Sequence, residues 1–342
     1  MIRAAVLGAS GYMGGELLRL LLGHPRATAV AATSRELAGR RVDGVHPNLR
    51  GHTDLVFTHP DRLGDCDVLF SALPHGDSMA RMPALLENVT DHVIDLSADF
   101  RLPDPDLYKR YYGTEHCAPH LLDTFVTGLP EFHRDRLRTA RRVSVPGCNA
   151  TAAVLALRPL AEAGMVEGPV TVDARTGSSG SGSSPGPAGT HAERSGAMRV
   201  FAPTGHRHQA EIATLTGLPV QMSATGVEAV RGVQVLCRVR LVPGIRGPDV
   251  RALFRHRYGD EPFVRIVSER RGQHRFPEPK ILSGSNHCDV GFAVDAEAGT
   301  VIVMAALDNL VKGGAGAAVQ CLNVSQDWPE RLGLDFFGLH PV

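Results

Sequence analysis

An apolar strand that runs into a glycine-rich turn and then a helix constrains this fold more than any other feature. Residues 3–7 (RAAVL) predict a buried strand, and GASGYMGG follows it from Gly8 onward. Residues 16–22 (ELLRLLL) predict a helix with one buried side, and the apolar residues 27–32 predict a second strand. This order of strand, turn, helix and strand is typical of the start of a doubly wound α/β sheet.

The glycines of this turn are spaced as GxxGxxG, at Gly8, Gly11 and Gly14. The first glycine permits a tight turn, the second lets a pyrophosphate approach the backbone, and the third lets helix and strand pack closely. The helix N-terminus supplies free N–H groups and positive potential for that phosphate. The sequence therefore predicts a dinucleotide-binding site here, with a turn that holds no ligand as the alternative.

The end of the second predicted strand distinguishes between the two nicotinamide cofactors. A site for NAD usually carries Asp or Glu there, which binds the ribose 2′-hydroxyl. This chain has Thr33, Ser34 and Arg35 instead, and a hydroxyl beside a guanidinium suits a 2′-phosphate. We therefore predict NADP(H) as the cofactor, with a solvated surface side chain as the alternative for Arg35.

The chain divides into two parts of different character, and its 342 residues suggest two domains. Residues 1–148 alternate strands with helix-sized intervals, which predicts an NADP-binding Rossmann domain. Its further strands are expected at 67–72, 92–96 and 142–145. Residues 149–308 predict an α+β catalytic and dimerisation domain with a mixed sheet. Its strands are expected at 170–174, 233–241, 289–295 and 300–306. A small-residue helix begins near 309, and we expect residues 309–342 to pack back on the first domain.

Composition excludes several classes of protein. Lys plus Arg and Asp plus Glu both number 36, so the chain lacks the basic excess of a nucleic-acid binder. No apolar run approaches the roughly 20 residues of a membrane span, and the N-terminus leaves no room for a secretory leader, so we expect a cytoplasmic protein. The six cysteines are scattered, without metal-binding spacing, so we expect reduced thiols and no metal site.

One cysteine stands where a nucleophile would be expected. Cys148 follows a predicted strand and the turn Pro146-Gly147, and it precedes the Ala-rich residues 150–161, which predict a helix. A thiolate at a helix N-terminus is stabilised, which lowers its pKa and makes it nucleophilic at neutral pH. The alternative is a small buried core residue.

A histidine-rich segment, GHRHQAEI, supplies a candidate acid–base pair. His208 and Glu211 are three residues apart, so on a helix they share a face and Glu211 could orient the imidazole of His208. A cysteine nucleophile needs such a base, and His206 is the alternative base. The segment is also compatible with an ordinary surface pair.

Together these segments resemble the N-acetyl-gamma-glutamyl-phosphate reductase family along nearly the whole chain. The matching stretches are GASGYMGGELLRLL, SALPHG, DLSADFRL, GLPE, VPGCNAT, SSGSG, GHRHQAEI and DNLVKGGAGAAVQCLN. The resemblance implies NADPH-dependent reduction of an acyl phosphate to an aldehyde through a thioester on Cys148. It also implies a homo-oligomer, either a dimer or a tetramer.

The resemblance further implies roles for single residues. Arg101 is a candidate for holding the substrate phosphate, and Asn149 and Glu211 are candidates for substrate binding. Asn309 is a candidate partner of the nicotinamide carboxamide. The other candidate cofactor-binding residues are Ser10, Tyr12, Met13, Leu73, Pro74, Ser179 and Gly180.

Three segments resemble the lysine-biosynthesis branch of this family more than its arginine-biosynthesis branch. They are the loop TGSSGSG from Thr176, the residues HAERSG from His191, and PTGHRH from Pro203. That branch acts on 2-aminoadipate 6-phosphate attached to a small acidic carrier protein. Residues 265–280 carry five Arg or Lys against two Glu, a patch that suits an acidic partner. The alternatives are free N-acetyl-glutamyl phosphate, both pathways, or a non-catalytic NADP-sensing protein.

Overall fold

The structure is a computed structural model that describes residues 1–183, 186 and 189–341. The Ser- and Gly-rich stretch at 176–189 therefore lies partly outside the described residues. The chain folds into two compact units. Unit 1 comprises Met1–Pro146, Gly182–Ser184 and Gly314–Asp335, and unit 2 comprises Gly147–Ser181, Pro185–Gly313 and Phe336–Val342.

Unit 1 is built on a six-stranded parallel sheet with the order β2-β1-β3-β4-β6-β5. Its strands are β1 (Ile2–Leu7), β2 (Ala27–Ala32), β3 (Val68–Ser71), β4 (Val93–Asp95), β5 (Val126–Thr127) and β6 (Arg142–Ser144). Its helices are α1 (Tyr12–Leu22), α2 (Val42–Val45), α3 (Asp77–Asn88), α4 (Pro105–Tyr112), α5 (Pro130–Leu137) and α10 (Gly316–Ser325). The Rossmann-type α/β expectation is confirmed.

The strand order places the glycine turn at the point where the chain changes direction across the sheet. From β1 the chain crosses to β2 on one side and then returns to β3 on the other. Ligands of such sheets bind at the carboxyl ends of the two strands that flank this point. Gly8 follows β1 and Leu73 follows β3, so both lie at that edge.

The C-terminal helix α10 packs against α1, α5 and β4 of unit 1. It is shorter and later than the sequence suggested, because a π-helical turn at Val311–Ala315 precedes its start at Gly316. In the described residues after Gln326 no helix or strand follows.

Unit 2 contains a seven-stranded mixed sheet with the order β11-β12-β13-β10-β7-β9-β8. Its strands are β7 (Val166–Thr176), β8 (Arg199–Ala202), β9 (Val220–Gly226), β10 (Val233–Leu241), β11 (Val264–Val267), β12 (Cys288–Asp295) and β13 (Thr300–Leu307). Its helices are α6 (Cys148–Glu162), α7 (His191–Arg194), α8 (His208–Thr216) and α9 (Gly247–Tyr258). The pairs β11–β12 and β7–β9 are parallel and the others antiparallel, which confirms the mixed sheet.

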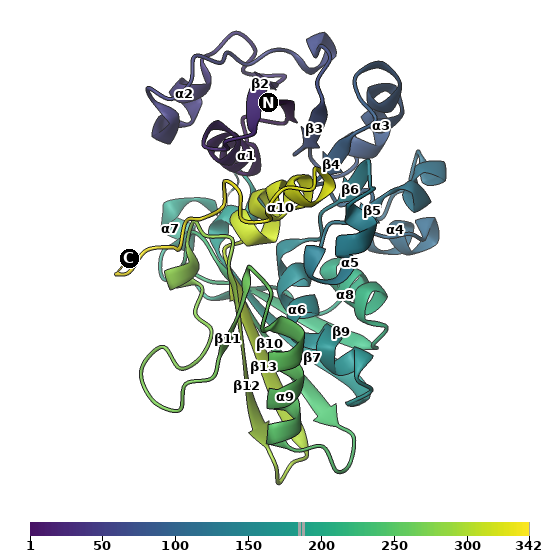
Figure 1. Cartoon of the computed structure of the whole chain (residues 1–342), viewed down its shortest axis with the longest axis vertical. Helices are drawn as coiled ribbons and strands as arrows, with labels where there is room; N and C mark the ends of the chain where they lie inside the picture. The colour runs from purple at the N-terminus through teal and green to yellow at the C-terminus, as the bar shows by residue number, and fades with distance from the viewer. Residues whose placement is uncertain (184–185, 187–188, 342) are drawn as a thin grey trace. The chain divides into compact units, whose positions relative to one another are not determined.

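Helix α6 is the centre of unit 2. It packs against β7, β10, β12 and β13 and against the helices α8 and α9, and Figure 1 shows α9 lying along this sheet. Most of its Ala- and Leu-rich residues are buried, as expected for a helix that is apolar nearly all round. Because α6 is enclosed in this way, its first residue, Cys148, has a fixed place in the unit.

Candidate active site

Two of the three motif glycines are required by the protein itself. Gly8 has φ +69°, and a Cβ there would lie 2.5 Å from the carbonyl oxygen of Ala72. A Cβ on Gly14 would lie 2.5 Å from Cα of Ala9, so any side chain would push α1 away from the turn. These contacts explain the first and third glycines without a ligand.

Gly11 differs, because no atom of the described residues explains why it is a glycine. Its backbone is extended (φ −79°, ψ 170°), and a Cβ there would meet its nearest neighbour at 3.7 Å, an ordinary contact distance. Gly11 is the N-cap of α1, without a side-chain cap, and the first turn carries no acidic residue. This open cradle at a helix N-terminus fits a dinucleotide pyrophosphate.

The side chains at the end of β2 are only partly available to a ligand. The buried hydroxyl of Ser34 accepts hydrogen bonds from Ser10 Oγ (3.0 Å) and from the N–H of Leu37 (3.2 Å). The side chain of Arg35 is 53% exposed, and its Nη1 lies 3.6 Å from Asp77. Arg35 can therefore reach a ligand, whereas Ser34 supports the turn.

The remaining expected cofactor residues of unit 1 lie beside the same turn. Tyr12 and Met13 begin α1, and the ring of Tyr12 is half exposed. Leu73 and Pro74 follow β3, and the backbone of Leu73 lies 3.3 Å from the position of a Cβ on Gly8. The structure thus brings these residues together at one edge of the sheet.

The DLSADFR motif ends β4 and is held by its own hydrogen bonds. The carboxylate of Asp99 accepts from the N–H groups of Gly76 and Met79 and from the hydroxyl of Tyr108. Arg101 donates from Nε to the carbonyl of Val145 (2.8 Å) and from Nη2 to the carbonyl of Leu96 (2.8 Å). Arg101 therefore braces the backbone that leads toward Cys148.

In unit 2, the reactive segment is assembled at the start of α6. Cys148 is the first residue of the helix and is partly exposed, with Gly147 as N-cap. The imidazole of His208 packs directly on Gly147, where a Cβ would overlap the ring. Glu211 is 1% exposed; its Oε2 accepts from the N–H of Gly147 (2.8 Å), and its Oε1 lies 3.8 Å from His208 Nε2. The pairing of His208 with Glu211 on one helix face agrees with the expectation from their spacing.

His206 has a supporting place in this cluster. Its Nδ1 accepts a hydrogen bond from the backbone N–H of His208 (3.1 Å), and the two rings meet edge to face at 4.7 Å. Burial, followed by the charge of Arg207, lowers the pKa of His206 to about 4. His206 is therefore neutral at physiological pH.

Polar contacts also fix the loop that follows β7. Asn149 Oδ1 accepts from the hydroxyl of Thr176 (2.9 Å). Asn309 donates from Nδ2 to the hydroxyl of Ser179 (2.9 Å) and accepts from the N–H of Gly232 (2.7 Å). The turn with Ser179 and Gly180 is thus tied to a residue 130 positions later in the chain.

The other cysteines lie in different environments. Cys66, Cys237, Cys288 and Cys321 are buried, and Cys117 is exposed, two residues before the short 3-10 helix Pro119–Thr124. Burial raises the pKa of the Cys66 thiol to about 11 and raises that of Cys237 as well. Cys148 is the cysteine that combines partial exposure with a helix N-terminus, the setting that favours a thiolate.

Sequence reasoning missed Gly313. A Cβ on Gly313 would lie 2.5 Å from Cβ of Cys148, so only glycine at 313 leaves room for the Cys148 side chain. The run of small residues at 313–316 was a signal of close packing, but nothing in the sequence says what packs there.

Within the described ranges, no helix is both long and apolar enough to cross a membrane. In the same part of the chain, no three His, Cys, Asp or Glu side chains gather as metal ligands would.

Comparison with known families assigns both units. The family model described as "Semialdehyde dehydrogenase, NAD binding domain" matches residues 3–140. The model described as "Semialdehyde dehydrogenase, dimerisation domain" matches residues 148–309. Fold, site and family models together define an oxidoreductase that uses a nicotinamide dinucleotide.

The relatives are similar over their full length. The LysW-L-2-aminoadipate 6-phosphate reductase of Deinococcus radiodurans is 45% identical over 341 residues, covering 99% of this chain and 98% of that protein. A candidate for the same enzyme in Thermomicrobium roseum is 48% identical and covers 100% of both chains. The chain belongs to the semialdehyde dehydrogenase family and, within it, to the group of the LysW-L-2-aminoadipate 6-phosphate reductases.

Solved structures share the fold at low sequence identity. Aspartate semialdehyde dehydrogenase II of Vibrio cholerae superposes with a TM-score of 0.70 at 15% identity, covering 96% of this chain and 98% of that chain. The aspartate semialdehyde dehydrogenase of Candida albicans, solved with NADP, gives 0.70 at 17% identity, covering 95% and 98%.

The two kinds of motif glycine predict opposite responses to the same substitution. Gly14→Ala should lower the free energy of unfolding by about 1–3 kcal/mol, because a methyl group forces the turn and α1 apart. Gly11→Ala should change that free energy by less than about 0.5 kcal/mol, because its Cβ has room, yet it should weaken dinucleotide binding. Urea denaturation and a fluorescence titration with the cofactor measure the two effects. Tight cofactor binding by Gly11→Ala would remove this turn from the pyrophosphate site.

Proposed function

We propose that this protein reduces the acyl phosphate of LysW-bound L-2-aminoadipate 6-phosphate to the semialdehyde, with NADPH, in lysine biosynthesis. The observation that carries the proposal is the cluster at the start of α6, where Cys148 heads the helix and His208 and Glu211 surround Gly147. The full-length relatives supply the substrate class. A non-catalytic NADP-sensing protein would not need this cluster.

The first step is acyl transfer to the thiol. Cys148, as a thiolate stabilised by the N-terminus of α6, attacks the carbonyl carbon of the acyl phosphate. A carbon–sulfur bond forms, the bond from that carbon to the phosphate oxygen breaks, and inorganic phosphate leaves. The product on the enzyme is a thioester.

The second step converts the thioester to the aldehyde. NADPH, when bound, supplies the hydride for the thioester carbon. His208 then donates a proton to the oxygen of the resulting hemithioacetal and later removes it. The hemithioacetal collapses, which releases the aldehyde and restores the thiolate. The carboxylate of Glu211 accepts a hydrogen bond from Gly147 and faces His208. We therefore assign Glu211 the role of a positioning residue, in place of the substrate contact that the resemblance implied.

Three other expected contact residues are also held by hydrogen bonds within the protein, so we propose supporting roles for them. Arg101 has two nitrogens on backbone carbonyls, so we propose that it shapes the phosphate site through the backbone that it holds. Asn149 likewise shapes the site through Thr176. Asn309 supports the nicotinamide side of the cofactor by holding Ser179.

The choice between the two histidines can be tested directly. Cys148→Ser should abolish reduction, and His208→Gln should lower kcat by about 10²–10⁴-fold, because general base catalysis is worth that much. His206→Gln should lower kcat by less than about tenfold, and it should leave the pH–rate profile between pH 5.5 and 8 unchanged, since a group with a pKa of about 4 does not titrate there. A profile that flattens in His206→Gln would make His206 the base.

NADPH preference should depend on Arg35. Its half-exposed guanidinium lies 3.6 Å from the carboxylate of Asp77, a distant partner that a 2′-phosphate would displace. Arg35→Ala should raise KM for NADPH by roughly 10- to 150-fold, the value of one charge-assisted contact, and leave KM for NADH nearly constant. Steady-state kinetics with both cofactors measure this. Equal changes in both KM values would place Arg35 outside the site.

Recognition of an acidic carrier is assigned to the basic tract at 265–280. Arg265 does not take part, because it forms an ion pair with Asp289 (2.6 Å). Arg270, Arg271 and Arg275 are exposed and form the rim that we propose for the carrier. The family model for a dimerisation domain at 148–309 supports a homo-oligomer, either a dimer or a tetramer.

A second substrate also has support. A relative in Thermococcus kodakarensis, 46% identical over 342 residues, is named as a candidate reductase for both LysW-L-2-aminoadipate and LysW-L-glutamate phosphates. Turnover should therefore be compared among carrier-bound aminoadipate, carrier-bound glutamate and free N-acetyl-glutamyl phosphate, the substrate of the arginine pathway.

Salt distinguishes a carrier-borne substrate from a small one. For carrier-bound substrate, kcat/KM should fall steeply between low and moderate salt, because exposed charges are screened beyond about 8–10 Å at physiological ionic strength. Reversing the charge at Arg270, Arg271 and Arg275 together should reproduce that fall and leave kcat nearly constant. If N-acetyl-glutamyl phosphate were the better substrate at low salt, the arginine-pathway function would replace the proposal.

A further inference from the structure

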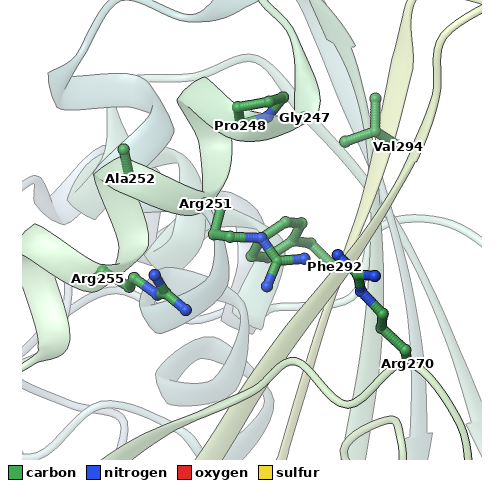
Figure 2. Close-up of a pocket in the computed structure, with 8 residues that line it drawn as sticks. All are labelled: Gly247, Pro248, Arg251, Ala252, Arg255, Arg270, Phe292 and Val294. Carbon is green, nitrogen blue, oxygen red and sulfur yellow. The ribbon is translucent and has the colours of Figure 1, made fainter.

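A cavity of about 520 Å³ opens in unit 2 between α9, β12 and the loop that follows β11 (Figure 2). Three arginine side chains line it, Arg251 and Arg255 from α9 and Arg270 from the loop. Phe292 and Val294 of β12 supply an apolar wall. No carboxylate is among the described residues that line the cavity.

The three arginines line the cavity without a carboxylate partner among the described residues. In the part of the chain that the structure describes, none of the three forms an ion pair. Asp249, on the same helix, is engaged elsewhere: it accepts from the backbone N–H of Arg246 (2.9 Å) and lies 3.7 Å from Arg246 Nε. Three like charges around one cavity repel each other, so an anion bound among them would lower the energy of the arrangement.

An aromatic surface accompanies the charges. The guanidinium of Arg251 lies over the ring of Phe292, 5.7 Å from its centroid, and Figure 2 shows it lying across that ring. Phe292 is itself stacked on Phe254, with centroids 5.4 Å apart and planes at 18°. A ring held in this way is a fixed platform for a flat or apolar group. The volume of the cavity falls in the range of small-molecule sites, about 300–1,000 Å³.

The cavity is separate from the reactive segment. Val294 pairs with Val301 on β13, and Leu307, at the other end of that strand, lies beside Gly313 and Cys148. Six residues at about 3.4 Å each place the two ends roughly 20 Å apart. The carbon that reacts at Cys148 therefore lies outside this cavity, although Arg270 belongs both to the cavity lining and to the rim proposed for the carrier.

We propose that the cavity binds a small organic polyanion with a flat or apolar body, such as a tricarboxylate or a phosphate ester. Its anionic groups would accept hydrogen bonds from the forked guanidinium groups of Arg251, Arg255 and Arg270, which suit carboxylate and phosphate oxygens. Its body would lie against Phe292. The proposal does not depend on the carrier-bound substrate.

Calorimetric titration in excess NADP⁺, which keeps the glycine turn occupied, tests the proposal. The probes are benzene-1,3,5-tricarboxylate and citrate, which carry similar charge but differ in having a flat ring. We expect one benzene tricarboxylate per subunit, bound more tightly than citrate. The double variant Arg251→Gln/Arg255→Gln should weaken its binding by about tenfold or more, since charge-assisted contacts are lost.

Two further variants make the result specific. Arg271→Gln/Arg275→Gln removes the same charge from the neighbouring loop without touching the cavity lining, so it should leave both affinities unchanged. Phe292→Leu keeps the wall apolar but removes the ring, so it should abolish the preference for benzene tricarboxylate over citrate. Absence of binding at millimolar probe concentration, or equal weakening in both double variants, would overturn the proposal.

Discussion

The hydrogen bond from the N–H of Gly147 to the buried carboxylate of Glu211 holds the reactive segment in place. It joins α8 to the residue just before α6, so the helix that Cys148 heads begins beside the helix that carries His208. The second oxygen of the same carboxylate faces His208. Without Glu211, a buried N–H would lose its partner, which costs about 1–3 kcal/mol, and the imidazole would lose its orientation.

Glycines make room for the side chains at the candidate site. Gly147 leaves room for the ring of His208, and Gly313 leaves room for Cβ of Cys148. Both glycines are needed because the side chains of Cys148 and His208 approach the backbone closely, not because of an unusual φ angle. Gly11 in unit 1 differs from both, because no described atom fills the space beside its Cα, and that space fits a phosphate.

The sequence predicted those parts of the molecule that depend on local patterns. Strands β1 and β10, the turn at Gly8 and the helix after Cys148 follow from periodicity and glycine spacing, so their positions were close to those observed. Contacts between distant segments could not be predicted in this way. The pairing of Asn309 with Ser179 depends on how the chain returns to the sheet, and the neutral state of His206 depends on its burial.

The formal net charge of the chain is zero, but its arginines differ in whether the protein supplies them with partners. Several of them donate to two acceptors at once: Arg101 bonds two carbonyls, and Arg265 uses two nitrogens on Asp289. A lysine ammonium would not reproduce these forked contacts. In the described part of the chain, by contrast, Arg251, Arg255 and Arg270 line one cavity and form no ion pair. A balanced total charge is therefore compatible with a local excess of positive charge, and a bound anion would neutralise that excess.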